Sequence, residues 1–206
     1  LIIFSLLLTS VSWSKDVDFK DLFERDGLFY EKFTDTPFTG TSTGLQQGKI
    51  KKGLRNGMWL EFYESGQLSY KVNYKEGKKD GKAISYSEEG VIVGKYPFEN
   101  GELNGRAYYY YDNGNLWVSS NWKNGVEDGE GKSYYGSGNL KSKATYKNRK
   151  TINRIEYYDD SSKQQKLIMK YNDKNQISEK LFYNLNGELE KTEIFKDGKL
   201  IETINH

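Results

Sequence analysis

Residues 57–81 read GMWLEFYESGQLSYKVNYKEGKKDG, and this pattern returns every 24 residues until about residue 152. The first glycine of each copy is Gly57, Gly81, Gly105 or Gly129. Other positions keep the same spacing: Gly66, Gly90, Gly114 and Gly138; Phe62, Tyr86, Tyr110 and Tyr134; Tyr74, Phe98, Trp122 and Tyr146. Agreement across so many positions indicates a repeat protein in which each unit is stabilised mainly by its neighbours.

Each copy is predicted to form a β-hairpin. In the first copy, residues 58–63 form one strand, 64–67 the turn and 68–74 the return strand, and the loop 75–81 leads to the next copy. Apolar and polar residues alternate along the return strands, so one face of the sheet is apolar and the other is exposed to solvent. No segment has the period of a helix that could cover the apolar face.

Two local features refine this prediction. Asn113-Gly114 favours positive φ angles and therefore a tight primed turn. Pro97 falls inside a return strand and cannot donate a ladder hydrogen bond, so we expect a bulge or a local break there.

The chain therefore divides into four parts around one all-β architecture. We expect an elongated antiparallel sheet of tandem hairpins, open and one layer thick, with four well-formed repeats over 57–152. Residues 15–56 form an N-terminal segment with a shortened first repeat, and 153–206 contain two degenerate repeats and a tail. The apolar side of the sheet should be closed by the segment 15–50 or by another molecule.

Residues 1–14, LIIFSLLLTSVSWS, are apolar and are followed by a polar sequence. The run is too short to span a bilayer and resembles the apolar part of a secretory signal, with Ser12 and Ser14 as small residues before the cleavage point. A buried N-terminal strand or helix is the alternative. We therefore expect an exported protein (periplasmic, at the cell surface or secreted), and without cysteine it is not a lipidated-Cys lipoprotein.

Composition excludes several function classes. The 31 Lys and Arg nearly balance 29 Asp and Glu, which argues against a nucleic-acid binder. The sequence has no cysteine and a single histidine, His206, so thiolate nucleophiles, Cys-based zinc sites and Ser-His-Asp triads are excluded. The acid pairs Glu127-Asp128 and Asp159-Asp160 are typical of turns. We expect no enzyme activity, no cofactor, no metal and no small-molecule substrate.

The aromatic and basic residues give the candidate binding surface. Several Trp and Tyr residues fall at positions assigned to the face opposite the apolar one, and Trp and Tyr dominate interface hot spots. Lysines of the return strands share the polar face and could attract anionic groups; a solvated face is the alternative. The candidate partner-binding residues are Trp59, Tyr63, Tyr109, Tyr111, Trp117, Tyr135, Lys71, Lys95, Lys141 and Lys143.

The repeat also resembles a known family. The unit Tyr63-Glu64-Ser65-Gly66-Gln67-Leu68, the unit Tyr111-Asp112-Asn113-Gly114-Asn115-Leu116 and the start at Pro37-Phe38-Thr39-Gly40 are similar to bacterial variant MORN repeats of the kind labelled YwqK-type antitoxins. The resemblance covers roughly residues 37–200. It implies an elongated sheet of hairpins with a toxin-neutralising or interaction role.

Three functions follow as hypotheses. The first is a non-enzymatic scaffold that binds a protein partner through an aromatic and charged sheet face. The second is an antitoxin-like protein that neutralises a toxin, and the third is a cell-wall glycan-associated binder or enzyme. An anionic lipid surface is a further possible partner.

Overall fold

The computed structural model describes residues 15–160 and 164–206. The signal sequence expected over residues 1–14 lies outside the described residues. Within them, no helix is long and apolar enough to cross a membrane.

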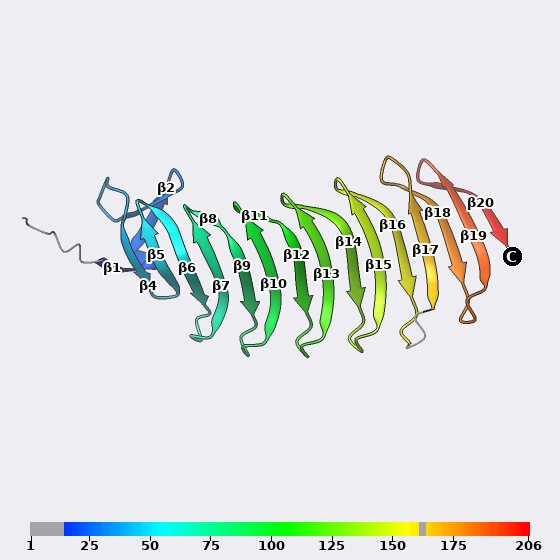
Figure 1. The fold of residues 1–206 in the computed structure, drawn as a ribbon, viewed down its shortest axis with the longest axis horizontal. Coiled ribbons are helices and arrows are strands. Elements are labelled where there is room, and N and C mark those ends of the chain that lie inside the picture. The colour runs from blue at the N-terminus through cyan, green and yellow to red at the C-terminus, as the bar shows by residue number, and fades with distance from the viewer. Residues whose placement is uncertain (1–14, 161–163) are drawn as a thin grey trace, which may run out of the picture.

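The described residues form one long sheet, which confirms the predicted open ribbon of hairpins (Figure 1). At the N-terminal end lie β1 (Lys15–Asp18), the short 3₁₀ helix η1 (Phe19–Asp21), β2 (Leu22–Arg25), β3 (Leu28–Glu31), β4 (Gly40–Thr43) and β5 (Gln46–Lys51). The repeats hold β6 (Leu54–Phe62), β7 (Leu68–Lys75), β8 (Lys78–Lys79), β9 (Gly81–Tyr86), β10 (Ile92–Glu99), β11 (Glu102–Leu103), β12 (Gly105–Tyr110), β13 (Leu116–Lys123), β14 (Val126–Tyr134) and β15 (Leu140–Lys147). The C-terminal part holds β16 (Lys150–Tyr157), β17 (Gln165–Tyr171), β18 (Ile177–Tyr183), β19 (Leu189–Lys196) and β20 (Lys199–Asn205).

From β4 to β20 the sheet is antiparallel and follows chain order, with β8 and β9 both paired to β7, β11 and β12 both paired to β10, and β1 added to β4 as a parallel strand. The hairpin β2–β3 is separate and lies against the N-terminal end of the sheet (Figure 1). The strands after residue 153 continue the same sheet without a break.

Except for the turn 172–176, which has the hydrogen bonds of the lower-edge turns, the turns along the upper edge of Figure 1 are tight two-residue turns. Glu76 and Gly77 have φ angles of 49° and 79°, and Asn124 and Gly125 have 49° and 72°. Two consecutive positive φ values define the primed turn whose twist matches that of the flanking strands. At Asn148-Arg149 the second position is Arg149, with φ of 67°, where the other turns of this kind have glycine.

The turns along the lower edge are built differently, so the predicted primed turn at Asn113-Gly114 is wrong. The Gly114 N–H donates to the Tyr111 carbonyl at 2.8 Å, and only Gly114, at 82°, has a positive φ. The turn is therefore an ordinary β-turn followed by a left-handed glycine, and the register shifts between Tyr109 and Tyr110 beside it. A longer turn of this kind tolerates asparagine without requiring it to adopt positive φ.

Pro97 lies within β10 and pairs in regular register with Lys82 of β9, but on the other side of β10 the ladder is interrupted between Lys95–Tyr108 and Phe98–Leu103, so the expected local break is present on that side. The Pro97 carbonyl accepts a hydrogen bond from the Asn104 N–H at 3.0 Å. The N–H and C=O of a strand residue point to the same neighbour, so the missing N–H of Pro97 would face the gap between β11 and β12. The ladder is already interrupted there, since Gly105 has a φ of 111°.

The core lies on one face of the sheet, called here the core face, and η1, β2 and β3 cover its N-terminal part. Trp59 pairs with Val72 across β6 and β7, and both side chains are fully buried. Phe19 of η1 meets the Trp59 ring at 6.1 Å, edge to face, and Phe29 of β3 joins the same cluster. The segment 15–50 therefore closes the first part of the apolar face.

From β12 to β15 the ribbon is a single layer, and aromatic rings lie against small residues on the same face (Figure 1). A Cβ added at Gly131 would lie 2.9 Å from the Tyr146 ring, so this ring rests directly on the backbone of β14. The Trp122 Nε1–H donates to Ser120 Oγ at 2.7 Å. Ala107 and Ser120 are thereby buried without a second layer of secondary structure.

Candidate interaction surface

Two of the ten candidate residues lie on the core face, contrary to the sequence-based prediction. Trp59 is fully buried and its Nε1–H donates to the Lys49 carbonyl at 3.1 Å. Tyr109 pairs with Val118 and contacts the Tyr96 ring edge to face at 5.4 Å, and burial raises the pKa of its hydroxyl. Trp59 is therefore not an exposed binding residue, and Tyr109 belongs to the packed face.

The tyrosines that follow the descending strands form a row near the lower edge, called here the tyrosine row: Tyr63, Tyr111, Tyr135 and Tyr158. Each hydroxyl donates to a backbone carbonyl of the next hairpin. The bonds are 2.8 Å for Tyr63 to Tyr86, 2.9 Å for Tyr111 to Tyr134, 3.0 Å for Tyr135 to Tyr157 and 2.8 Å for Tyr158 to Tyr183. The corresponding residue of the second repeat is Ser87, for which the side chain is too short to reach the next hairpin.

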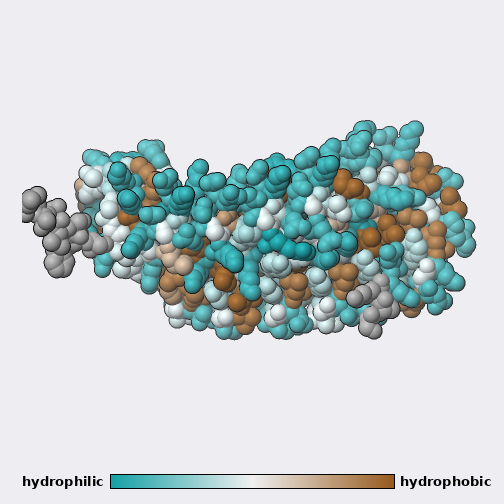
Figure 2. Space-filling view, viewed as in Figure 1, coloured by the Kyte–Doolittle hydropathy of each residue, from teal (hydrophilic) through white to brown (hydrophobic). Residues whose placement is uncertain are grey.

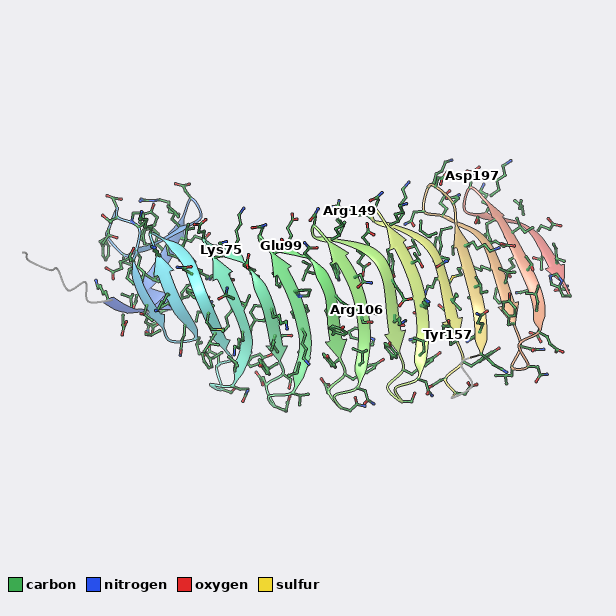
Figure 3. All side chains as sticks on the ribbon, in the orientation of Figure 1. Lys75, Glu99, Arg106, Arg149, Tyr157 and Asp197 are labelled. Atoms are coloured by element: carbon green, nitrogen blue, oxygen red, sulfur yellow. The ribbon has the colours of Figure 1, made fainter. Side chains whose placement is uncertain are left out.

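Sequence reasoning missed Tyr158, because the register of the descending strands shifts after residue 152. Tyr157, and not Tyr158, ends β16, and Figure 3 shows Tyr157 near the lower edge. The signal that identifies the row is a tyrosine at the first position of each lower turn, as in Tyr111-Asp112-Asn113-Gly114.

Three side chains cover rings of this row. Trp117 lies 5.9 Å from Tyr111 between ring centroids, Lys141 Nζ lies 5.5 Å from the centroid of Tyr135, and Lys166 Nζ lies 5.8 Å from that of Tyr158. All three are exposed, and Trp117 retains 49% of its surface. We call these residues the rim strip: Tyr111, Trp117, Tyr135, Lys141, Tyr158 and Lys166. The hydrogen bonds of the row hold the strip on a rigid backbone.

The remaining lysines lie on the face opposite the core face, called here the lysine face. Lys71 pairs with Ile84, Ile84 with Lys95 and Lys95 with Tyr108, so these residues follow one line across the strands. The Lys95 ammonium lies 5.2 Å from the Tyr110 ring centroid. Lys71 and Lys95 are thus placed together, but away from Trp59 and Tyr109.

Lys132 and Lys143 face each other directly on this line, and Glu130 bridges them. Its carboxylate oxygens lie 2.7 Å from Lys132 Nζ and 2.8 Å from Lys143 Nζ, and Arg106 is 3.9 Å away. The two lysine hydrogen bonds lower the pKa of Glu130 to about 2. Lys143 is therefore neutralised within the sheet and offers less charge to a partner than Lys95 or Lys141.

A shallow hollow of about 290 Å³ lies over β13–β16, and Trp117, Lys141, Glu127 and Tyr146 are among its lining residues. Burial raises the pKa of the Glu127 carboxyl, and a hydrogen bond with Ser120 partly offsets that effect. Among the residues that the structure describes, no three His, Asp or Glu side chains are grouped closely enough to hold a metal ion. The arrangement offers aromatic surface, cations and one partly buried carboxyl.

Comparison with known families gives the repeat a name. A family model described as MORN repeat variant matches residues 55–76, 79–100, 103–124 and 127–148. Within residues 55–148 the chain is therefore similar to four tandem MORN-type repeats. Each matched segment covers a descending strand, a lower turn and an ascending strand, and the same hairpin continues through β16–β20 beyond the last match. No curated protein matches the chain.

Proposed function

We propose that this protein is a non-enzymatic repeat scaffold that binds a protein partner through the rim strip. The observation that carries the proposal is the exposure of Trp117, at 49% of its surface, beside a tyrosine that is hydrogen-bonded in place. Among the tryptophans that the structure describes, Trp59 is buried and Trp122 is half-buried with its N–H bonded to Ser120.

The physical case rests on rigidity and chemistry. A large ring already fixed in the free protein loses little conformational entropy on binding, and Trp, Tyr and neighbouring cations are the groups that dominate interface energetics. Lys141 and Lys166 lie along the same strip, so the surface suits a partner that places apolar groups on Trp117 and carboxylates beside it. MORN-type repeats support a scaffold role for the chain.

The test is co-purification from the native source with matched variants. Trp117→Ala should reduce recovery of the partner at least about tenfold, as expected for a hot-spot residue. Met58→Ala is the control, because Met58 is 51% exposed on β6 and lies outside the strip. Both variants should keep the circular dichroism of the wild type. Undiminished recovery with Trp117→Ala would refute the proposal.

Toxin neutralisation is the narrower form of this proposal, in which the partner is a toxin. It predicts that the wild type suppresses the toxicity of the captured protein and that Trp117→Ala does not. A captured protein without toxicity would leave the scaffold role standing and reject the antitoxin role.

An exposed tryptophan beside a tyrosine also suits stacking on sugar rings, which favours glycan binding as a second candidate. Sedimentation with cell-wall polysaccharide tests it. Binding to the polysaccharide that Trp117→Ala abolishes, with no protein partner recovered, would favour the glycan role over the protein partner.

We also propose that the protein is exported, on the strength of the apolar residues 1–14 and the polar sequence that follows. N-terminal sequencing of the native protein should find Lys15 as the first residue. Retention of Leu1–Ser14 on the native protein would refute this part of the proposal.

A further inference from the structure

The two long edges of the ribbon carry opposite charge. The upper edge consists of the turns 51–54, 75–78, 99–102, 123–126, 147–150, 172–176 and 196–199, which hold eleven Lys or Arg against five Asp or Glu. Figure 3 shows Lys75, Glu99, Arg149 and Asp197 along this edge, and Figure 2 shows the same edge as mostly hydrophilic.

The lower edge consists of the turns 63–67, 87–91, 111–115, 135–139, 158–160 and 184–188. Its acidic residues are Glu64, Glu88, Glu89, Asp112, Asp159, Asp160 and Glu188, and the described residues of these turns include no Lys or Arg. The sequence between Asp160 and Gln164 adds Lys163, which lies outside the described residues. The chain as a whole is nearly neutral, so the fold itself separates the charges. All ascending strands end at the basic edge and all descending strands end at the acidic edge.

Several of these edge charges form no ion pair with another described residue. Among the described residues of the upper edge, only Lys174 forms an ion pair, with Asp197 at 3.3 Å. On the lower edge, Glu64, Glu88 and Asp112 form no ion pair with any described residue. Unpaired charges of one sign along a rigid edge favour an occupant of the opposite sign.

We propose that copies of this chain associate side by side, with the basic upper edge of one copy against the acidic lower edge of the next. A second copy supplies both complementary edges at once. It also supplies them at the same interval, because each hairpin of two strands adds about 10 Å along either edge. An anionic surface would match the upper edge alone and would leave the acidic edge without a role.

The geometry of this contact sets its consequences. The two edges are different surfaces, so the contact is heterologous and leaves one free edge of each kind for a further copy. Both sheet faces stay uncovered, and the side-by-side array would repeat the rim strip in parallel rows. Exposed ion pairs are individually weak and are screened by salt, so the association depends on several turns acting together at low ionic strength.

The experiment is sedimentation velocity of the full chain across concentration and salt. The wild type should form species larger than a dimer at about 20 mM salt and should be monomeric at about 0.5 M salt, where the screening length is only a few ångströms. Lys75→Glu/Lys123→Glu/Lys147→Glu changes the upper edge, and Glu64→Lys/Glu88→Lys/Asp112→Lys changes the lower edge. Each triple variant alone should weaken association at least about tenfold, since three attractions become repulsions.

The matched control is Lys71→Glu/Lys95→Glu on the lysine face, compared with the double upper-edge variant Lys75→Glu/Lys123→Glu, which changes net charge by the same amount. This control should associate as the wild type does, and an equimolar mixture of the two edge variants should associate again. Circular dichroism of each variant verifies folding. A wild-type protein that stays monomeric at low salt would overturn the proposal, as would an equal loss of association in the control variant. Binding of the wild type to anionic vesicles without self-association would also overturn it.

Discussion

At the scale of single residues, Arg149 is the clearest departure from the repeat. It occupies the left-handed second position of an upper turn, with φ of 67°, where glycine stands in the other turns of that type. A side chain costs roughly 1 kcal/mol in this conformation. Arg149→Gly should therefore raise the free energy of unfolding by about 1 kcal/mol, partly offset by glycine's extra freedom in the unfolded chain.

Chemical denaturation of Arg149→Gly and Arg149→Lys measures this effect. The lysine variant keeps the strained backbone and should match the wild type. Equal stability of all three proteins would show that the turn at Asn148-Arg149 imposes no strain.

Glu130 gives a pH-dependent prediction at the same scale. Its pKa falls from 4.5 to about 2 on folding, so its contribution to stability is fully present above the unfolded value and is lost as the pH falls toward 2. Glu130→Gln leaves Lys132 facing Lys143 without a counter-charge and should cost up to about 1 kcal/mol at neutral pH. The difference from the wild type, measured by urea unfolding, should shrink below pH 4.5; a constant difference down to pH 2 would contradict the ion-pair explanation.

Substitutions at Trp59 and Trp117 are expected to differ in their effect on the free energy of unfolding, because Trp59 is buried and Trp117 is exposed. Trp59→Ala should cost about 3–5 kcal/mol because it empties a fully buried site beneath η1. Trp117→Ala should change the free energy of unfolding by less than about 1 kcal/mol, since nearly half of its surface is already in water. Thermal unfolding of both variants measures this; equal losses would mean that Trp117 is also a packing residue.

At the scale of elements, the tyrosine row links each hairpin to the next. Tyr111→Phe removes the bond to the Tyr134 carbonyl while keeping the ring, and should cost about 1 kcal/mol. Tyr108→Phe is the control, because no hydrogen bond of its hydroxyl joins it to another hairpin among the described contacts. Hydrogen exchange at the lower end of β14 should quicken only in Tyr111→Phe; unchanged exchange would deny the linking role.

The sequence predicted the hairpins well because the 24-residue spacing and the alternation of the return strands report backbone geometry directly. It failed on the face of Trp59, because odd and even positions were assumed to keep their faces across the lower turn. The turn and its bulge change that parity: Trp59, an odd position, pairs with Val72, an even one. A bulge of one residue is invisible to a hydrophobicity pattern, and it decides which aromatic rings are buried.

The candidate site was predictable to the same limited degree. Several residues of the rim strip could be chosen from the sequence because they are aromatic or basic. Their exposure could not be predicted, because it depends on the packing of each ring against residues of other strands. Tyr158 joins the tyrosine row because the register of the descending strands shifts by one residue after residue 152. Nothing in the local sequence states that the hydroxyl of Tyr111 reaches the next hairpin, since that contact spans 23 residues.

At the scale of the whole molecule, stability comes from contacts between adjacent hairpins, and among the residues that the structure describes only the N-terminal part has a second layer. A chain of this design has two sheet faces and two edges available to other molecules, unlike a globular domain of equal length. The opposite charges of the edges and the exposed Trp117 are therefore consequences of the same open architecture.

Small-angle X-ray scattering of the chain at high salt tests that architecture most directly. The eighteen strands occupy sixteen positions along the ribbon, because β8 and β9 share one beside β7 and β11 and β12 share one beside β10. At about 4.8 Å per position they make a rod roughly 75 Å long, with a radius of gyration near 25 Å. A compact domain of this length would have a radius of gyration of about 17 Å. A monomer with the larger value and a rod-like distance distribution is the result expected here, and a monomer with the smaller value would contradict the open ribbon.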